Sequence, residues 1–180
     1  MGVKLFVVTL FVVSIFSLFS EITKYVIKKD TKDSPLITFT DAIMYTLNQD
    51  EVLRIVDAQT AIRYKTRDEM YKAMITTRVK DKNNNDVKDT VSAQKMIKKA
   101  DLYSFFDDVK YNRDDFMVLR THELYYDIKK EIAYNSVPFQ SIYNGDVLNG
   151  NNFYADNKTK FFRASKSHFE INMNKPIKKN

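Results

Sequence analysis

Val91-Ser92-Ala93-Gln94-Lys95-Met96-Ile97 is one of four copies of a short pattern that recurs along this chain. Each copy has an apolar residue, a small residue two positions on, and larger, mostly apolar residues three and four positions after that. The other copies are 56–62, 119–125 and 148–154, and successive copies start 35, 28 and 29 residues apart. A repeat of this length predicts one supersecondary unit stacked on itself. The copies have no catalytic residue type in common.

The apolar positions change phase inside each copy. Val91 and Ala93 would share one face of a regular strand, whereas Met96 would lie on the other face. A bulge or corner near the small residue would redirect the strand, and Gly150 permits such a bend most freely. The pattern therefore predicts an all-β fold of two facing antiparallel sheets, a β-jellyroll with an open groove.

Strand signals rich in Ile, Val, Tyr and Phe run from Ile37 to Met173. Two windows, 61–73 and 92–106, have compositions that also fit helices, but the repeat favours strands there. The pairs Asn144-Gly145 and Asn149-Gly150 are the strongest hairpin signals. Polar clusters indicate further turns, at 48–50, 81–86, 107–108, 112–115 and 156–158.

The amino-terminal segment predicts a membrane anchor. Residues 5–19 are almost entirely Leu, Phe, Val and Ile, and as a helix they would cover roughly 22 Å of a ~30 Å hydrocarbon core. Residues 22–27 supply the missing length. The residues expected to contact lipid include Leu5, Phe6, Phe11, Ile15 and Phe19.

A cleaved signal peptide is the alternative, although Ser-Leu-Phe-Ser-Glu-Ile at 17–22 offers a poor cleavage site. The lysines that follow the span would, on the positive-inside rule alone, leave the rest of the chain in the cytoplasm. These signals divide the chain into an anchor with its flank (1–29), a linker (30–36), a β-domain (37–174) and a tail (175–180).

Charge and chemistry exclude several classes of function. Beyond residue 29 the chain has 25 basic and 22 acidic residues of interspersed sign, which argues against a nucleic-acid partner. There is no cysteine, so disulfides and thiolate metal sites are excluded. His122 and His168 lie in no catalytic motif, and His122 is expected to be solvated. We expect no catalytic residues, no metal and no cofactor.

Three shorter motifs have ordinary structural explanations. Residues 81–86 resemble the start of a calcium loop but lack its glycine, and the twelfth position is Ser92, so a hairpin tip is expected. The acidic pairs 107–108 and 114–115 are expected in turns. Residues 157–159 match the glycosylation sequon. The 13 phenylalanines, 11 tyrosines and 7 methionines build a core, and along an open groove they would suit acyl chains.

An amino-terminal anchor joined to repeating small-residue strands resembles the LptC family of lipopolysaccharide-transport proteins. The matching segments, in order, are 40–45, 91–95, 119–121 with 126–127, 149–150 with 154–156, and 169–171. The resemblance implies a β-jellyroll in the periplasm tethered to the inner membrane by a single span. The family receives lipopolysaccharide from an inner-membrane ABC transporter and passes it to a soluble periplasmic jellyroll partner. Association with the transporter would then fix the orientation of the chain in the membrane, although the lysines alone favour the opposite orientation.

Carried over by position, Thr40 and Phe169 fall where the family lines its acyl groove, and Met74 is a looser match. Gly150 matches the family's structurally sensitive glycine. Two hypotheses follow. The chain is either a passive lipid conduit or an anchored structural module that bridges envelope proteins through strand edges without binding lipid. An enzyme is a third possibility, which would depend on His122 or Asp127.

Overall fold

The computed structural model describes residues 33–47, 52–80, 86–114 and 116–173. The chain divides into two units, Met1–Asp33 and Ser34–Asn180, and the β-fold belongs to the second unit. The predicted anchor, the tail at 175–180 and most of the hairpin tip at 81–86 lie outside the described residues. In the part of the chain that the structure describes, no helix has the length and hydropathy of a membrane span.

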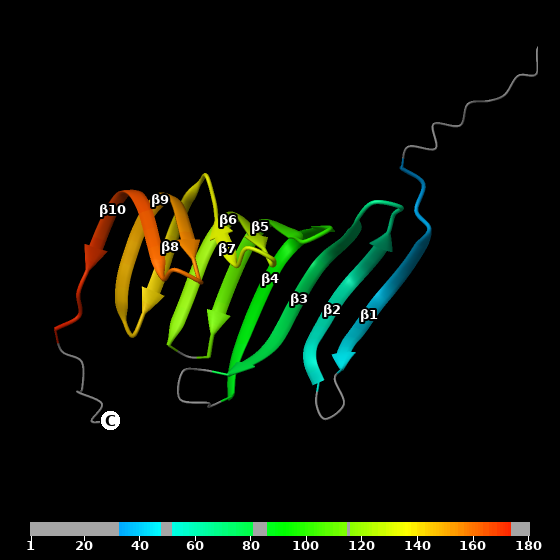
Figure 1. The fold of residues 1–180 in the computed structure, drawn as a ribbon, viewed down its shortest axis with the longest axis horizontal. Helices are drawn as coiled ribbons and strands as arrows, with labels where there is room; N and C mark the ends of the chain where they lie inside the picture. The colour runs from blue at the N-terminus through cyan, green and yellow to red at the C-terminus, as the bar shows by residue number, and fades with distance from the viewer. Residues whose placement is uncertain (1–32, 48–51, 81–85, 115, 174–180) are drawn as a thin grey trace, which may run out of the picture. The chain divides into compact units, whose positions relative to one another are not determined.

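Ten antiparallel strands form one hydrogen-bonded sheet (Figure 1). Each strand pairs with the next from β1 to β6, the short β7 and β8 both lie between β6 and β9, and β10 pairs with β9. The strands are β1 (Ile37–Leu47), β2 (Val52–Arg63), β3 (Asp68–Lys80), β4 (Asp86–Lys99), β5 (Leu102–Arg113), β6 (Met117–Asp127), β7 (Ile132–Tyr134), β8 (Pro138–Tyr143), β9 (Asp146–Asp156) and β10 (Phe161–Glu170). The predicted antiparallel all-β class is confirmed, and each ambiguous window contains parts of two strands and the connection between them. The two facing sheets are instead two halves of a single sheet.

A line of irregularities crosses the sheet at the middle of its long strands. Asp41, Lys72, Asn152 and Lys166 have positive φ there, and the register shifts between β4 and β5 and between β5 and β6 fall on the same line. In each copy of the repeat the third and sixth positions are both buried. Two residues between them point outward where a regular strand would have one, so the strand turns. The predicted corner is confirmed.

Small side chains occupy this corner. Ala42, Ala58, Ala73 and Ala93 are direct register partners across β1 to β4. The same line continues through four further residues, Val109, Thr121, Phe139 and Gly150. The large Phe139 ring lies directly against Gly150 there. Small residues suit this line because the two halves of every strand converge there, which leaves little volume on the inner side.

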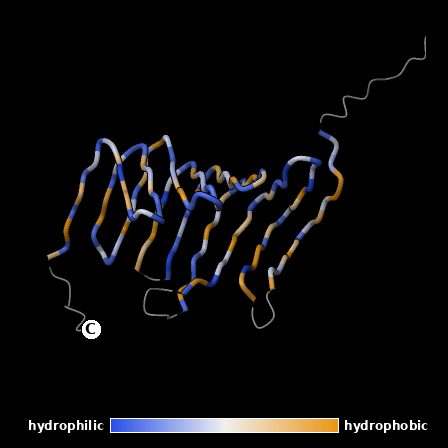
Figure 2. The backbone as a smooth tube through the Cα atoms, in the orientation of Figure 1, coloured by the Kyte–Doolittle hydropathy of each residue, from blue (hydrophilic) through white to orange (hydrophobic). Residues whose placement is uncertain are grey.

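The corner separates two half-sheets that pack against each other. Half-sheet A holds the strand segments with Val56 and Val91, and half-sheet B holds those with Ala61 and Met96. We call the side that carries the buried residues the inner face. Figure 2 shows hydrophobic and hydrophilic residues interleaved along the strands, as expected for a sheet with one buried face. Met96, at 0% exposure, lies at the centre of the core.

Strands β7 and β8 are one strand that breaks at the corner. The buried Asn135 bridges the break with its side chain, whose amide nitrogen donates to Thr121 Oγ1 at 2.9 Å and to the Val137 carbonyl at 3.0 Å. Its amide oxygen accepts from the Phe153 N–H at 3.0 Å. One side chain thus replaces the ladder bonds that the break removes, because buried polar groups need partners.

Two turn predictions are wrong, and the corner explains both. Asn149-Gly150 lies in the middle of β9, and Asp107-Asp108 forms the bulge of β5 with both φ values positive. Asp tolerates the left-handed backbone that the bulge of β5 needs, whereas Gly150 lies where Phe139 and the Ser165 carbonyl approach the strand closely. Asn144-Gly145 does form the β8–β9 hairpin, as predicted.

We expect Gly150→Ala to lower the free energy of unfolding by about 1–3 kcal/mol, as overpacking does. An added Cβ would lie 3.1 Å from Phe139 Cε1 and 3.3 Å from the Ser165 carbonyl oxygen. The Phe139 ring cannot withdraw easily, because it packs edge-on against Phe153 at 5.1 Å between centroids. Denaturant unfolding of Gly150→Ala, Phe139→Leu and the double variant measures the coupling. Strictly additive losses would contradict this account of the corner.

Candidate functional site: the inner face

At both edge strands, β1 and β10, apolar side chains are left exposed by the rest of the described chain. Of the fifteen large hydrophobic side chains that are exposed among the described residues, seven lie at 36–47 and five at 161–173. Such concentration indicates a binding surface.

Five of these side chains belong to the inner face by register. Ile37, Phe39 and Met44 align with Arg63, Ala61 and Val56, and we call them the β1 patch. Phe162 and Phe169 align with Ala155 and Leu148, and we call them the β10 patch. Phe39 is 54% exposed and Phe169 is 57% exposed.

A polar band runs along the inner face beyond the apolar rows. It consists of five residues, Arg54, Asp89, Arg113, Tyr103 and Tyr126. Arg113 donates from Nε and Nη2 to the two oxygens of Asp89, each at 2.7 Å. This hydrogen bond raises the pKa of the Arg113 guanidinium. Burial, followed by the Asp89 charge, raises the pKa of the neighbouring Tyr111 phenol, so that this phenol stays protonated.

Arg54 joins the two half-sheets, and no carboxylate of the described residues forms an ion pair with it. Its Nη1 donates to the Tyr103 hydroxyl at 3.3 Å. Its Nε is buried and is the one buried side-chain nitrogen or oxygen without a hydrogen-bond partner in the described chain. The Arg54 side chain as a whole is half-buried, and a buried N–H without an acceptor is unfavourable, because its desolvation is not offset.

The structure separates the residues predicted for the acyl groove. Phe169 lies on the inner face, and Gly150, predicted as a structurally sensitive glycine rather than a groove residue, lies at the corner. Thr40 aligns with Thr60 on a row that points outward, and Met74 aligns with Asp57 on another outward row. The roles in lipid binding stay predictions, and Phe169 is the residue among Thr40, Met74 and Phe169 that an inner-face ligand would contact.

The polar band was missed by sequence reasoning, although a signal was present. Arg54 and Asp89 lie two residues before Val56 and Val91, the first positions of two repeat copies. Alternation places each in phase with its buried neighbour. A charged residue in phase with a core row predicts an ion inside the fold.

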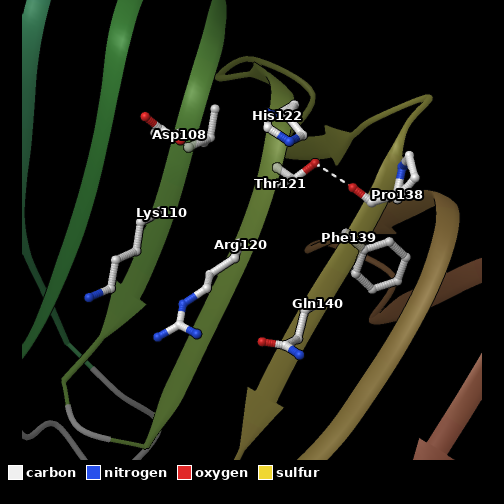
Figure 3. Close-up of a pocket in the computed structure, with 9 residues that line it drawn as sticks. Asp108, Lys110, Arg120, Thr121, His122, Pro138, Phe139 and Gln140 are labelled. Atoms are coloured by element: carbon white, nitrogen blue, oxygen red, sulfur yellow. Dashed lines mark hydrogen bonds between the residues drawn. The ribbon is translucent and has the colours of Figure 1, made fainter.

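A separate hollow of about 530 Å³ lies where β5, β6 and β8 meet the corner (Figure 3). Lys110 and Arg120 are register partners and point the same way there, and Thr121 Oγ1 donates to the Pro138 carbonyl at 3.0 Å. The lining also includes the exposed His122.

The residues of the enzyme alternative are not brought together. Asp127 lies roughly 17 Å along β6 from His122, at five residues of extended strand, and accepts from the Lys130 N–H at 2.9 Å in the following turn. Within the described ranges, no three His, Cys, Asp or Glu side chains are grouped to hold a metal ion.

Comparison with known proteins finds structural likeness at low sequence identity. No protein-family model matches the chain, and no curated protein matches it. Among solved structures, the chain is similar to the crystal structure of LptH from Pseudomonas aeruginosa. That protein is described as the LptA-homologous periplasmic component of the conserved lipopolysaccharide transport device. The TM-score is 0.39 at 10% sequence identity, over 76% of this chain and 94% of LptH.

Two arginine-to-methionine variants distinguish the arginines of the polar band. We expect Arg54→Met to leave the free energy of unfolding unchanged or higher, because it removes a half-buried cation whose buried Nε has no acceptor in the described chain. Arg113→Met is expected to lower it by about 1–3 kcal/mol, because Asp89 loses two charged hydrogen bonds. Chemical denaturation measures both. An equal loss in the two variants would show that Arg54 is a structural ion like Arg113.

Proposed function

We propose that this chain is a membrane-tethered, non-catalytic component of lipopolysaccharide export. It accepts lipopolysaccharide from an inner-membrane ABC transporter and passes it to a soluble jellyroll protein in the periplasm. The ordered motifs that resemble the LptC family support this role. The chemistry of the inner face supports it independently.

The observation that carries the proposal is the pair of uncovered patches on the inner face. A soluble domain that has finished folding has little reason to leave Phe39 and Phe169 more than half exposed on the same side as its core. Acyl chains suit these patches because they need apolar area and conformable neighbours more than polar precision. The polar band beside the apolar rows suits the polar end of such a lipid.

Transfer in this proposal is passive. Acyl chains lie along the inner face, and the outer edges of β1 and β10, which have no strand partner in the described chain, pair with neighbouring proteins by strand addition. The inner faces of successive proteins then form one continuous surface. Direction comes from ATP hydrolysis in the transporter.

A structural module that binds no lipid is the second candidate, and the middle of the inner face favours it. Ala58 and Met96 are fully buried and Val109 is 2% exposed, so this region is filled by the protein's own side chains. In that case the two patches would be covered by protein partners.

Photo-crosslinking in cells separates the two candidates. A photoreactive residue at Phe169 or Met44 is expected to capture lipopolysaccharide, because both positions face inward. The adjacent positions His168 and Ile43 face outward and serve as matched controls. Immunoblotting for lipopolysaccharide on the purified protein gives the readout. Protein adducts at the inward positions with no lipid adduct would reject the conduit and favour the structural module.

A further inference from the structure

Arg54 lies beside the β1 patch. It is on β2, one strand in from the edge, and aligns with Thr46 of β1, while Met44 of the patch aligns with Val56. Two residues along a strand correspond to about 7 Å. An acyl chain on the patch would therefore bring the group at its end within reach of the guanidinium.

Two phenol donors and one cation lie around Arg54, together with the carboxylates of Asp89 and Glu131. Tyr103 shares its hydroxyl with Arg54 Nη1, and Lys98 Nζ lies 5.8 Å from the Tyr103 ring centroid. Burial, followed by the charge of Glu131, raises the pKa of the nearby Tyr126 phenol, which stays a donor. Asp89, the carboxylate of the band, is held on both oxygens by Arg113.

Among the described residues, Arg54 has no anionic partner. Its buried Nε has no acceptor, and a guanidinium presents a planar fork of donors that matches phosphate oxygens two at a time. A protein that adds a strand to the free edge of β1 would supply backbone groups there. It would place no negative charge beside Arg54, which lies one strand in from that edge. A neutral lipid would leave the cation unpaired.

We propose that Arg54, with Tyr103, Tyr126 and Lys98, binds the phosphate group of an amphiphile whose acyl chain lies on the β1 patch. This inference rests on the proposed function and adds the chemical class of the head group and the place where it binds. It also supplies an acceptor for the buried Arg54 Nε, which has none in the described chain.

The test compares two amphiphiles of equal chain length, dodecyl phosphate and the neutral dodecyl glucoside. Binding is measured by calorimetry below their micelle concentrations, on the full-length chain in nanodiscs. Charged hydrogen bonds to one phosphate predict that the wild type binds dodecyl phosphate about tenfold or more tightly. Arg54→Gln is expected to bind both amphiphiles equally. Arg120→Gln, which removes an outward-facing arginine, is expected to keep the preference.

Each of the other outcomes rejects a different part of the proposal. Equal binding of both amphiphiles by the wild type rejects the phosphate site and leaves the lipid conduit standing. No binding of either amphiphile rejects the conduit and the site with it. Inorganic phosphate that binds the wild type as tightly as dodecyl phosphate would show a site for free phosphate rather than for a lipid head group.

A second measurement needs no variant, should Arg54→Gln fail to fold. The arginine Nε–Hε signals of the wild type are followed by NMR during addition of dodecyl phosphate. The Arg54 signal is expected to shift while the Arg120 signal stays fixed. An unmoved Arg54 signal in the presence of bound dodecyl phosphate would reject the site.

Discussion

The structure depends on the close approach of the two half-sheets along a row of small side chains. Ala42, Ala58, Ala73 and Ala93 follow one another across four strands. Because each strand turns at its small residue, side chains before and after the turn reach the same inner face. Larger side chains in place of these four alanines would force the halves apart. The shape of the inner face, and the side chains that it offers to a ligand, follow from that constraint.

The inner face carries two kinds of surface that an ordinary core would not combine. Its apolar rows remain uncovered at β1 and β10, and its polar band holds one ion pair and one cation without a counter-ion. Asp89 and Arg113 satisfy each other and stabilise the fold. Arg54 has no such partner, and a hydrophobic side chain would serve stability at least as well. An amphiphile with an anionic head explains both features together, since its chain covers the patch and its head pairs with the cation.

The class of fold and the corner could be predicted because both follow from the spacing of apolar residues. The slip from alternation between Ala93 and Met96 is visible in the sequence. Whether the backbone hydrogen bonds continue through the bend is not visible there, so one folded sheet and two facing sheets give the same pattern. No local feature of the sequence predicts the strand break that Asn135 bridges.

The candidate site was harder to predict, because the face on which a residue lies depends on the position of the bulge. Asp41 in the left-handed region sets Ala42 and Met44 inward and leaves Thr40 on an outward row. A displacement of one residue reverses this assignment, and the sequence does not show at which residue each strand bulges. Sequence reasoning missed Arg54 because it did not interpret a charged residue in phase with a core row as an ion inside the fold.

The methionines provide a direct test of lipid binding on the inner face. Met44 on the inner face and Met74 on an outward row are nearly equally exposed, at 39% and 43%. The full-length chain is labelled with ¹³C at the methionine methyl groups, and a phospholipid with a nitroxide on its acyl chain is added. The account predicts that the Met44 signal broadens strongly while the Met74 signal remains sharp. Equal broadening of both signals, or broadening of Met74 alone, would contradict it.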